Sequence, residues 1–188
     1  VDSIDKARQR ENTLVIFTSD NGGSTVQNND TKYPDDKCPY GKLTGNNLPL
    51  RGQKGSLYEG GIRVPTIARW PGKLKPGTEF ETPICVIDWM PTFCALAEAK
   101  VDSTKLKWDG VNLWPALTGE AKLLTRSLHI AGPGGNRWAL RDGDWKLILT
   151  QNKNRHTAER PKIELFNIAN DPNEKTDVGR ENPGKVNE

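Results

Sequence analysis

A carboxylate and a carboxamide stand side by side just beyond the point where a strand is expected to end. Asp20 and Asn21 follow the apolar run 14–17 (Leu-Val-Ile-Phe), and two glycines, Gly22 and Gly23, come next. Side-chain oxygens of both types bind hard cations such as calcium and magnesium. Ligands also gather beyond the carboxyl ends of strands in open α/β sheets. The pattern fits a metal site, and it also fits an Asx turn completed by glycine.

Positive charge stands in a second, glycine-rich stretch, residues 50–65. Four of its sixteen residues are glycine, which lets the backbone approach a ligand closely. Arg51 and Lys54 suit an oxyanion, because lysine acts as a compact point charge and arginine binds as a fork. The alternative is a glycine-rich turn whose two cations are solvated.

The elements that must position these residues suggest an α/β arrangement. An unbroken apolar run such as 14–17 is typical of a strand buried on both faces, as in a sheet between helices. Another strand is expected at 66–70, a helix from Asp88 to about residue 99, and a short helix at 113–117. Asp88 is interpreted as the cap of its helix rather than as a catalytic carboxylate.

The pattern changes after residue 126. Four short strands separated by turns are expected at 128–130, 138–140, 145–149 and 163–166. Asp142-Gly143 is a hairpin signal between two of them. The sequence therefore predicts an α/β part at 1–126 and a small antiparallel four-stranded subdomain at 127–188.

The composition limits the possible partners. The chain has 188 residues, 34% of them hydrophobic and 27% charged, which is compatible with a folded domain. Its net charge is only +3 and no dense basic block occurs, so nucleic-acid binding is not expected. No apolar run approaches the roughly 18 residues that a membrane span needs. The three cysteines, Cys38, Cys85 and Cys94, lack metal-type spacing.

Taken together, the two site stretches resemble the second half of type I sulfatases of the arylsulfatase family, in the alkaline phosphatase-like superfamily. The shared pattern is Ser-Asp-Asn-Gly-Gly at 19–23, then Leu-Arg-Gly-x-Lys-Gly at 50–55 and Tyr-Glu-Gly-Gly-Ile-Arg-Val-Pro at 58–65. Further motifs recur in the family's order at 68–72 (Ala-Arg-Trp-Pro-Gly), 88–92 (Asp-x-x-Pro-Thr), 109–113 (Asp-Gly-Val-Asn-Leu), 145–148 (Trp-Lys-Leu-Ile), 164–167 (Glu-Leu-Phe-Asn) and 171–172 (Asp-Pro).

The resemblance implies a fold and roles for single residues. Residues 1–126 would be the C-terminal part of the catalytic domain, within an alkaline phosphatase-like sheet sandwiched by helices. Asp20 and Asn21 match two calcium ligands of sulfatases, with magnesium as the alternative ion. Lys54 matches the catalytic lysine that contacts the sulfate, and Arg51 is expected to reach the substrate. A divalent cation and a lysine would hold the negative oxygens of a sulfate monoester while the ester oxygen leaves.

Part of the family's site is missing from the 188 residues. Sulfatases carry an early Cys-x-Pro-x-Arg or Ser-x-Pro-x-Arg motif whose first residue is oxidised to formylglycine, the nucleophile, and none of the three cysteines fits it. The family's catalytic histidines precede its Asp-Asn pair, whereas His129 and His156 both follow Lys54. His129 and His156 are interpreted as a strand residue and a solvated loop residue, and a role in substrate recognition stays open.

We therefore expect the C-terminal fragment of a longer enzyme, inactive by itself, whose partner is the missing N-terminal half. The intact protein would hydrolyse a sulfate monoester of a small molecule or glycan, and would be periplasmic or secreted. One alternative is a phosphate or phosphonate ester hydrolase of the same superfamily. Another is a non-catalytic module that binds sulfated glycans. The nucleophile motif upstream distinguishes these possibilities.

Overall fold

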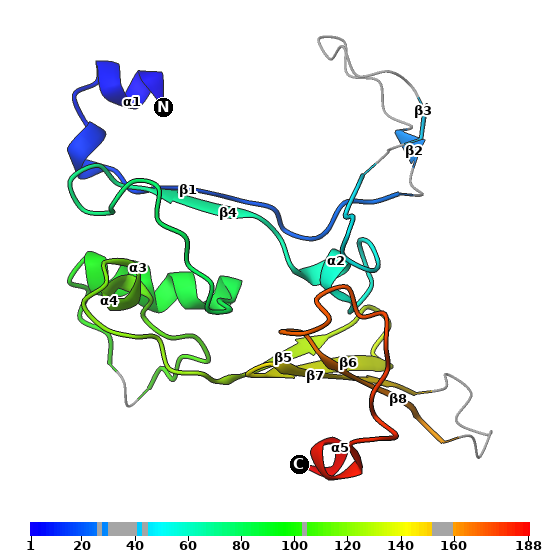
Figure 1. Cartoon of the computed structure of the whole chain (residues 1–188). Coiled ribbons are helices and arrows are strands. Elements are labelled where there is room, and N and C mark those ends of the chain that lie inside the picture. Colours follow the sequence, from blue (N-terminus) through cyan, green and yellow to red (C-terminus); the bar gives the residue numbers. More distant parts are fainter. Residues whose placement is uncertain (26–27, 30–40, 43–44, 103–104, 152–159) are drawn as a thin grey trace. The chain divides into compact units, whose positions relative to one another are not determined.

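The computed structural model describes residues 1–25, 28–29, 41–42, 45–102, 105–151 and 160–188. They form two compact units, each built from two stretches of the chain (Figure 1). Unit 1 comprises residues 1–17 and 67–125, and unit 2 comprises residues 18–66 and 126–188. Unit 2 therefore joins the segment of the predicted site to the second half of the chain. The predicted domain division at residue 126 stays a prediction.

Unit 1 contains a two-stranded sheet and several short helices. Strand β1 (Val15–Thr18) pairs with β4 (Thr66–Arg69), and the last residue of β1 and the first of β4 are counted in unit 2. The helices are α1 (Asp2–Lys6), the 3-10 helices η1 (Arg10–Asn12) and η2 (Val86–Asp88), α3 (Trp89–Leu96) and α4 (Trp114–Leu117). The strands predicted at 14–17 and 66–70 and the short helix predicted at 113–117 are confirmed within one or two residues.

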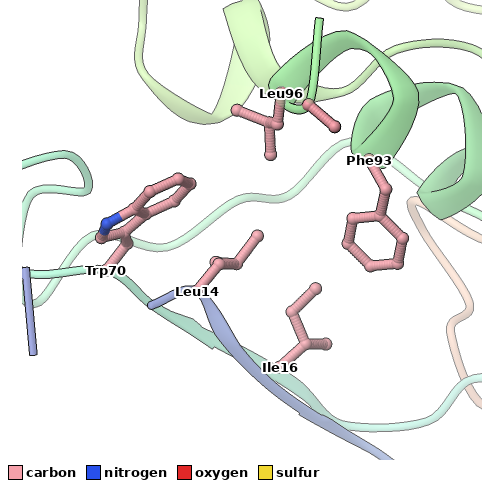
Figure 2. Close-up of a pocket in the computed structure, with 6 residues that line it drawn as sticks. Leu14, Ile16, Trp70, Phe93 and Leu96 are labelled. Atoms are coloured by element: carbon pink, nitrogen blue, oxygen red, sulfur yellow. The ribbon is translucent and has the colours of Figure 1, made fainter. Parts of the chain in front are cut away.

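Strand β1 differs from the prediction in its burial. Leu14 and Ile16 point toward Phe93 and Leu96 of α3 (Figure 2). Phe17 is 68% exposed. The expectation of burial on both faces is therefore wrong for this chain. The physical reason is that alternate residues of a strand face opposite sides, and α3 covers the side of Leu14 and Ile16.

Asp88 has a structural role, as predicted, but not as the cap of α3. Its side chain makes no capping hydrogen bond to α3. Its fully buried carboxylate accepts the Cys85 N–H through Oδ2 at 2.7 Å and the Val111 N–H through Oδ1 at 3.0 Å. These bonds join the turn before α3 to the segment before α4.

Unit 2 contains the predicted antiparallel meander. Four strands, β5 (Ser127–Ala131), β6 (Arg137–Asp142), β7 (Trp145–Thr150) and β8 (Lys162–Asn167), pair in sequence order. Gly143, in the turn between β6 and β7, has a positive φ of 54°, which a glycine adopts without strain. The four-stranded subdomain and the α/β class are thus confirmed.

The core of unit 2 lies where the glycine-rich stretch meets this sheet. Its buried residues come from the stretch, from β6, β7 and β8, and from the residue that follows β8: Leu57, Ala139, Ile148, Phe166 and Ile168. Helix α2 (Glu59–Ile62) follows directly after Leu57. Burying Leu57 against the sheet therefore fixes the segment that carries Arg51 and Lys54.

The remaining described elements of unit 2 are short. Strands β2 (Asn28–Asn29) and β3 (Gly41–Lys42) form an antiparallel pair, and α5 (Pro183–Asn187) ends the chain. Cys38, His156 and most of the predicted loops 24–49 and 151–161 lie outside the described residues. Over the described ranges, no helix combines the length and apolar character that crossing a bilayer requires.

Candidate functional site

The turn after β1 carries the two predicted metal ligands. Asp20 is exposed at the surface, and Asn21 is half-buried. The Asn21 Nδ2 donates a hydrogen bond of 3.0 Å to the Gly22 carbonyl, so the amide oxygen points away from that carbonyl. Ser19 Oγ donates to the Asn21 carbonyl at 2.7 Å. The turn thus presents one carboxylate and one amide oxygen in adjacent positions.

This turn packs directly against the glycine-rich stretch. The Gly22 N–H donates to the Gly61 carbonyl at 3.0 Å, and the Lys54 N–H donates to the Gly23 carbonyl at 3.3 Å. Gly22 is buried, and a Cβ at this position would overlap the Gly60 carbonyl oxygen. Only a glycine therefore permits this approach of the two backbones. The structure brings the two predicted stretches together, while the roles of Asp20, Asn21 and Lys54 stay predictions.

Two amide side chains that sequence reasoning missed reinforce the junction. Asn47 brackets Gly23, because its Oδ1 accepts the Gly23 N–H at 2.7 Å and its Nδ2 donates to the Gly23 carbonyl at 2.8 Å. Gln53 Oε1 accepts the Thr25 N–H at 3.1 Å. Neither residue carries a local sequence signal, since amides are common in polar loops.

Lys54 lies on an exposed part of the loop. Gly52 and Gly55 flank it with positive φ values of 90° and 82°, so the backbone turns sharply on both sides. The lysine side chain is exposed. This arrangement suits a cation that binds an anion arriving from solvent.

Arg51 is engaged within unit 2. Its guanidinium carbon lies 3.8 Å from the centroid of the Tyr58 ring. Its Nη1 donates to the Glu174 carbonyl at 2.9 Å, and its Nη2 lies 3.9 Å from Glu164 Oε1. The side chain is still 41% exposed. The structure thus shows what holds Arg51, and its contact with a substrate stays a prediction.

Tyr58 links this arginine to the sheet. Its hydroxyl donates to the Glu164 carboxylate at 3.1 Å, and its ring contacts Phe166 edge-on with a centroid separation of 6.2 Å. Burial, and then the charge of Glu164, raise the pKa of Tyr58 above its usual value. Tyr58 therefore remains a protonated donor and a stacking platform for Arg51.

A buried ion cluster lies beneath the glycine-rich stretch. Lys146 of β7 is fully buried, and its Nζ lies 2.9 Å from Glu59 Oε1. It also lies 2.7 Å from Glu174 Oε1. Burial raises the pKa of Glu174, and the hydrogen bond and charge of Lys146 offset part of that increase. The sequence did contain a signal, a lysine within the otherwise apolar strand 145–149, because a lysine at a buried strand position needs a partner.

The oxygen donors of the turn fit part of a calcium shell. Calcium takes about six to eight oxygen ligands, whereas Asp20 and Asn21 supply two side chains. Within the described parts of the chain, no group of three or more His, Cys, Asp or Glu side chains has the arrangement of a metal site. His129, the one histidine in those parts, is exposed on β5. Asp20 and Asn21 by themselves therefore do not complete a calcium shell.

Unit 1 contains an apolar hollow of about 480 Å³ (Figure 2). Hydrophobic residues in or next to β1, β4 and α3 line it: Leu14, Ile16, Trp70, Phe93, Leu96 and Ala97. No charged or acid–base side chain lines it, so it cannot hold a charged ester. The junction in unit 2 therefore remains the candidate site, because it carries the charged and oxygen-bearing side chains Asp20, Asn21 and Lys54.

Comparisons with known proteins identify the family of the chain. The Sulfatase family model matches residues 1–99 of the chain. A sulfatase of Formosa agariphila is 32% identical over 183 residues, covering 93% of this chain and 30% of the relative. Arylsulfatase A of Homo sapiens is 33% identical over 183 residues, covering 87% of this chain and 33% of the relative. The chain thus spans about a third of the length of these curated relatives.

A solved structure matches over nearly the whole chain. Ps i-CgsB in complex with k-i-k-neocarrahexaose has a TM-score of 0.78 and a sequence identity of 33%. The match covers 99% of this chain and 36% of that chain. The similarity therefore includes both compact units.

Proposed function

Because the chain belongs to the sulfatase family, we propose that it is the C-terminal portion of an enzyme that hydrolyses a sulfate monoester. The observation that supports this most directly is the junction of the two site stretches. The Lys54 N–H bonds to the Gly23 carbonyl, so the loop of the lysine adjoins the turn of Asp20 and Asn21. A cation-binding turn beside an anion-binding loop is the arrangement that a sulfate ester requires.

Each residue has a defined role in this proposal. Asp20 and Asn21 contribute two oxygen ligands to a calcium ion, with magnesium as the alternative. The ion, when bound, neutralises negative charge on the sulfate oxygens. Lys54 binds a sulfate oxygen as a point charge, and Arg51 contributes the exposed part of its guanidinium to the substrate.

The rest of the site is proposed to come from a longer polypeptide. The curated relatives are about three times as long as the stretch matched here. Unit 1 also leaves large apolar residues uncovered, including Phe17 at 68% and Ile67 at 62% exposure. Exposed apolar surface of this kind marks an interface. An upstream segment would cover it and supply the formylglycine and further metal ligands.

The proposed substrate is a sulfated glycan. The 33%-identical structure of Ps i-CgsB is a complex with k-i-k-neocarrahexaose, which supports this choice, and the 33%-identical arylsulfatase A keeps a small aryl sulfate as the alternative. We further propose that the intact protein is periplasmic or secreted, because a sulfated polysaccharide is too large to reach an enzyme inside the cell.

The test is expression of the complete reading frame, followed by assays for sulfate release from neocarrageenan oligosaccharides and from 4-nitrophenyl sulfate. An upstream Cys/Ser-x-Pro-x-Arg motif together with sulfate release is the expected result. Hydrolysis of 4-nitrophenyl phosphate without sulfate release would instead indicate a phosphate or phosphonate ester hydrolase. Binding of the oligosaccharide without release of either ion would indicate a non-catalytic module.

A further inference from the structure

The stability of the protein alone does not explain the buried cluster of Lys146, Glu59 and Glu174. All three side chains are at least 93% buried. Taking three ionisable groups out of water is costly, and well-packed apolar residues of similar volume are often at least as stabilising. Net stability alone is therefore a poor reason for a cluster of this kind. Its other contacts indicate a second role.

Glu174 contacts both ends of the loop that carries Lys54. Its Oε2 accepts the Glu59 N–H at 2.6 Å, and its carbonyl accepts Arg51 Nη1 at 2.9 Å. Between these points the loop closes on itself, because the Gly60 N–H donates to the Arg51 carbonyl at 2.7 Å. Glu174 thus holds Arg51 and Glu59 at fixed positions relative to each other.

The conformation of Glu174 agrees with this constraint. Its φ is 54°, in the left-handed region that residues other than glycine seldom adopt. Such a conformation persists where the surroundings impose it. Here the Lys146 ammonium and the Glu59 N–H both hold its carboxylate.

The constraint reaches the candidate site through backbone hydrogen bonds. Lys54 lies between the two fixed ends, and its N–H donates to the Gly23 carbonyl at 3.3 Å. Just after Gly60, the Gly61 carbonyl accepts the Gly22 N–H at 3.0 Å. A shift of the loop ends would therefore move Lys54 relative to the turn of Asp20 and Asn21.

We propose that Glu174, held by Lys146, is a positioning residue for Lys54. It fixes both ends of the loop 51–60 and so determines the position of the Lys54 ammonium relative to the turn that follows β1. The consequence for turnover depends on the proposed sulfatase function, whereas the positioning itself does not. A displacement of about 1 Å at a reacting group can lower a rate on the order of a hundredfold.

Hydrogen exchange in the 188-residue chain tests the positioning without any assay of activity. The Glu174→Ala variant should exchange the amides of Gly22, Lys54 and Gly60 faster than the wild type. Asp177→Ala is the control, because the Asp177 carboxylate likewise accepts backbone N–H groups, but from Leu165 and Gly179, which lie outside the loop.

The two variants are compared at equal global stability, with the Leu113 amide of unit 1 as an internal reference. Faster exchange of the Gly22, Lys54 and Gly60 amides in Glu174→Ala alone is the expected result. Equal exchange in the two variants would overturn the proposal. If Glu174→Ala does not fold, Glu174→Gln takes its place, because it keeps the shape and one acceptor but loses the charge. It should also speed exchange of the three amides, but by less.

A double-mutant cycle in the complete enzyme then separates positioning from folding. Glu174→Ala should lower kcat about ten- to a hundredfold by itself, but less than about twofold in a Lys54→Ala background, because the lysine is already absent. A loss of the same size in both backgrounds would identify Glu174 as merely structural. Absence of sulfate release from the wild type would refute the proposed function, and the exchange experiment would still decide the positioning.

Discussion

Lys54 and Asp20 carry opposite charges on two stretches whose backbones are joined by hydrogen bonds. Both side chains are exposed, so solvent screens them until a substrate and a metal ion exclude water. We expect each to act by binding an opposite charge, Lys54 an anion and Asp20 a cation. These roles can be separated experimentally, because one substitution should affect turnover and the other should first affect metal content.

The Lys54→Ala substitution should lower turnover of the complete enzyme sharply. Removing one donor to the charge that develops in a transition state costs about a hundred- to a thousandfold in rate. The measurement is kcat for sulfate release. The control is Lys73→Ala, which removes an exposed lysine of unit 1 and should leave kcat unchanged. Kinetics of Lys54→Ala equal to those of the wild type would remove Lys54 from the site.

The Asp20→Ala substitution should weaken calcium retention by at least about tenfold, because even residues that only support metal ligands contribute this much. Metal analysis of the purified complete protein after dialysis measures the effect. Glu120→Ala, which also deletes one exposed carboxylate, controls for nonspecific cation binding. An unchanged calcium content in Asp20→Ala would exclude Asp20 as a ligand.

At the scale of elements, close packing of glycines holds the site together. The turn after β1 reaches the glycine-rich stretch only because Gly22 has no side chain next to the Gly60 carbonyl. Asn47 then satisfies both backbone groups of Gly23. The junction is thus built mainly from backbone, which leaves the side chains of Asp20 and Lys54 available to ligands.

The Gly22→Ala substitution should destabilise the chain by about 1–3 kcal/mol, the usual cost of forcing a methyl group into a packed site. Urea unfolding measures the loss. Gly184→Ala is the control, because a Cβ there meets no atom within 4 Å. We expect the control to be neutral or slightly stabilising, since alanine favours a helix. A similar unfolding midpoint for Gly22→Ala and wild type would contradict the close approach of the two backbones.

Asp88 holds two elements of unit 1 together and should matter for stability rather than for catalysis. In Asp88→Asn, the side-chain NH2 group would face either the Cys85 N–H or the Val111 N–H, and that partly buried donor would lose its acceptor. The expected loss of unfolding free energy is about 1–3 kcal/mol, measured by urea unfolding. The kcat of the folded complete enzyme should not change. A large fall in kcat at unchanged stability would instead indicate a catalytic carboxylate.

At the scale of the whole molecule, the chain combines the candidate site with exposed apolar residues. The apolar hollow and the exposed Phe17 and Ile67 belong to unit 1, whereas the charged junction belongs to unit 2. Both features are explained by one proposal, that a further segment of a longer protein covers the first and completes the second.

The 188-residue chain by itself should therefore show no sulfatase turnover. It contains no Cys/Ser-x-Pro-x-Arg motif, and its turn supplies two of the about six to eight oxygens that calcium needs. The measurement is hydrolysis of 4-nitrophenyl sulfate by the purified chain, with the complete enzyme as the positive control. Turnover by the chain alone would refute the expectation that the nucleophile lies elsewhere.

The amino-acid sequence alone was sufficient to predict the family and the four strands between residues 127 and 167, and to indicate the two stretches of the candidate site. These features are local: apolar alternation, an Asp-Gly turn, and short motifs can be recognised within a few residues. The one-sided burial of β1 could not be predicted, because it depends on which other element covers each face.

Only the tertiary structure decided how the site is supported. Residues 18–66 pack with residues 126–188, and this packing brings Glu174 to Arg51 and Glu59, and Lys146 to Glu59. These partners lie far apart in the chain, and each charge is tolerated only because folding buries it beside the others. No local sequence pattern encodes these contacts between distant residues. A lysine within an apolar strand therefore indicates that a partner is needed, but it does not identify the partner.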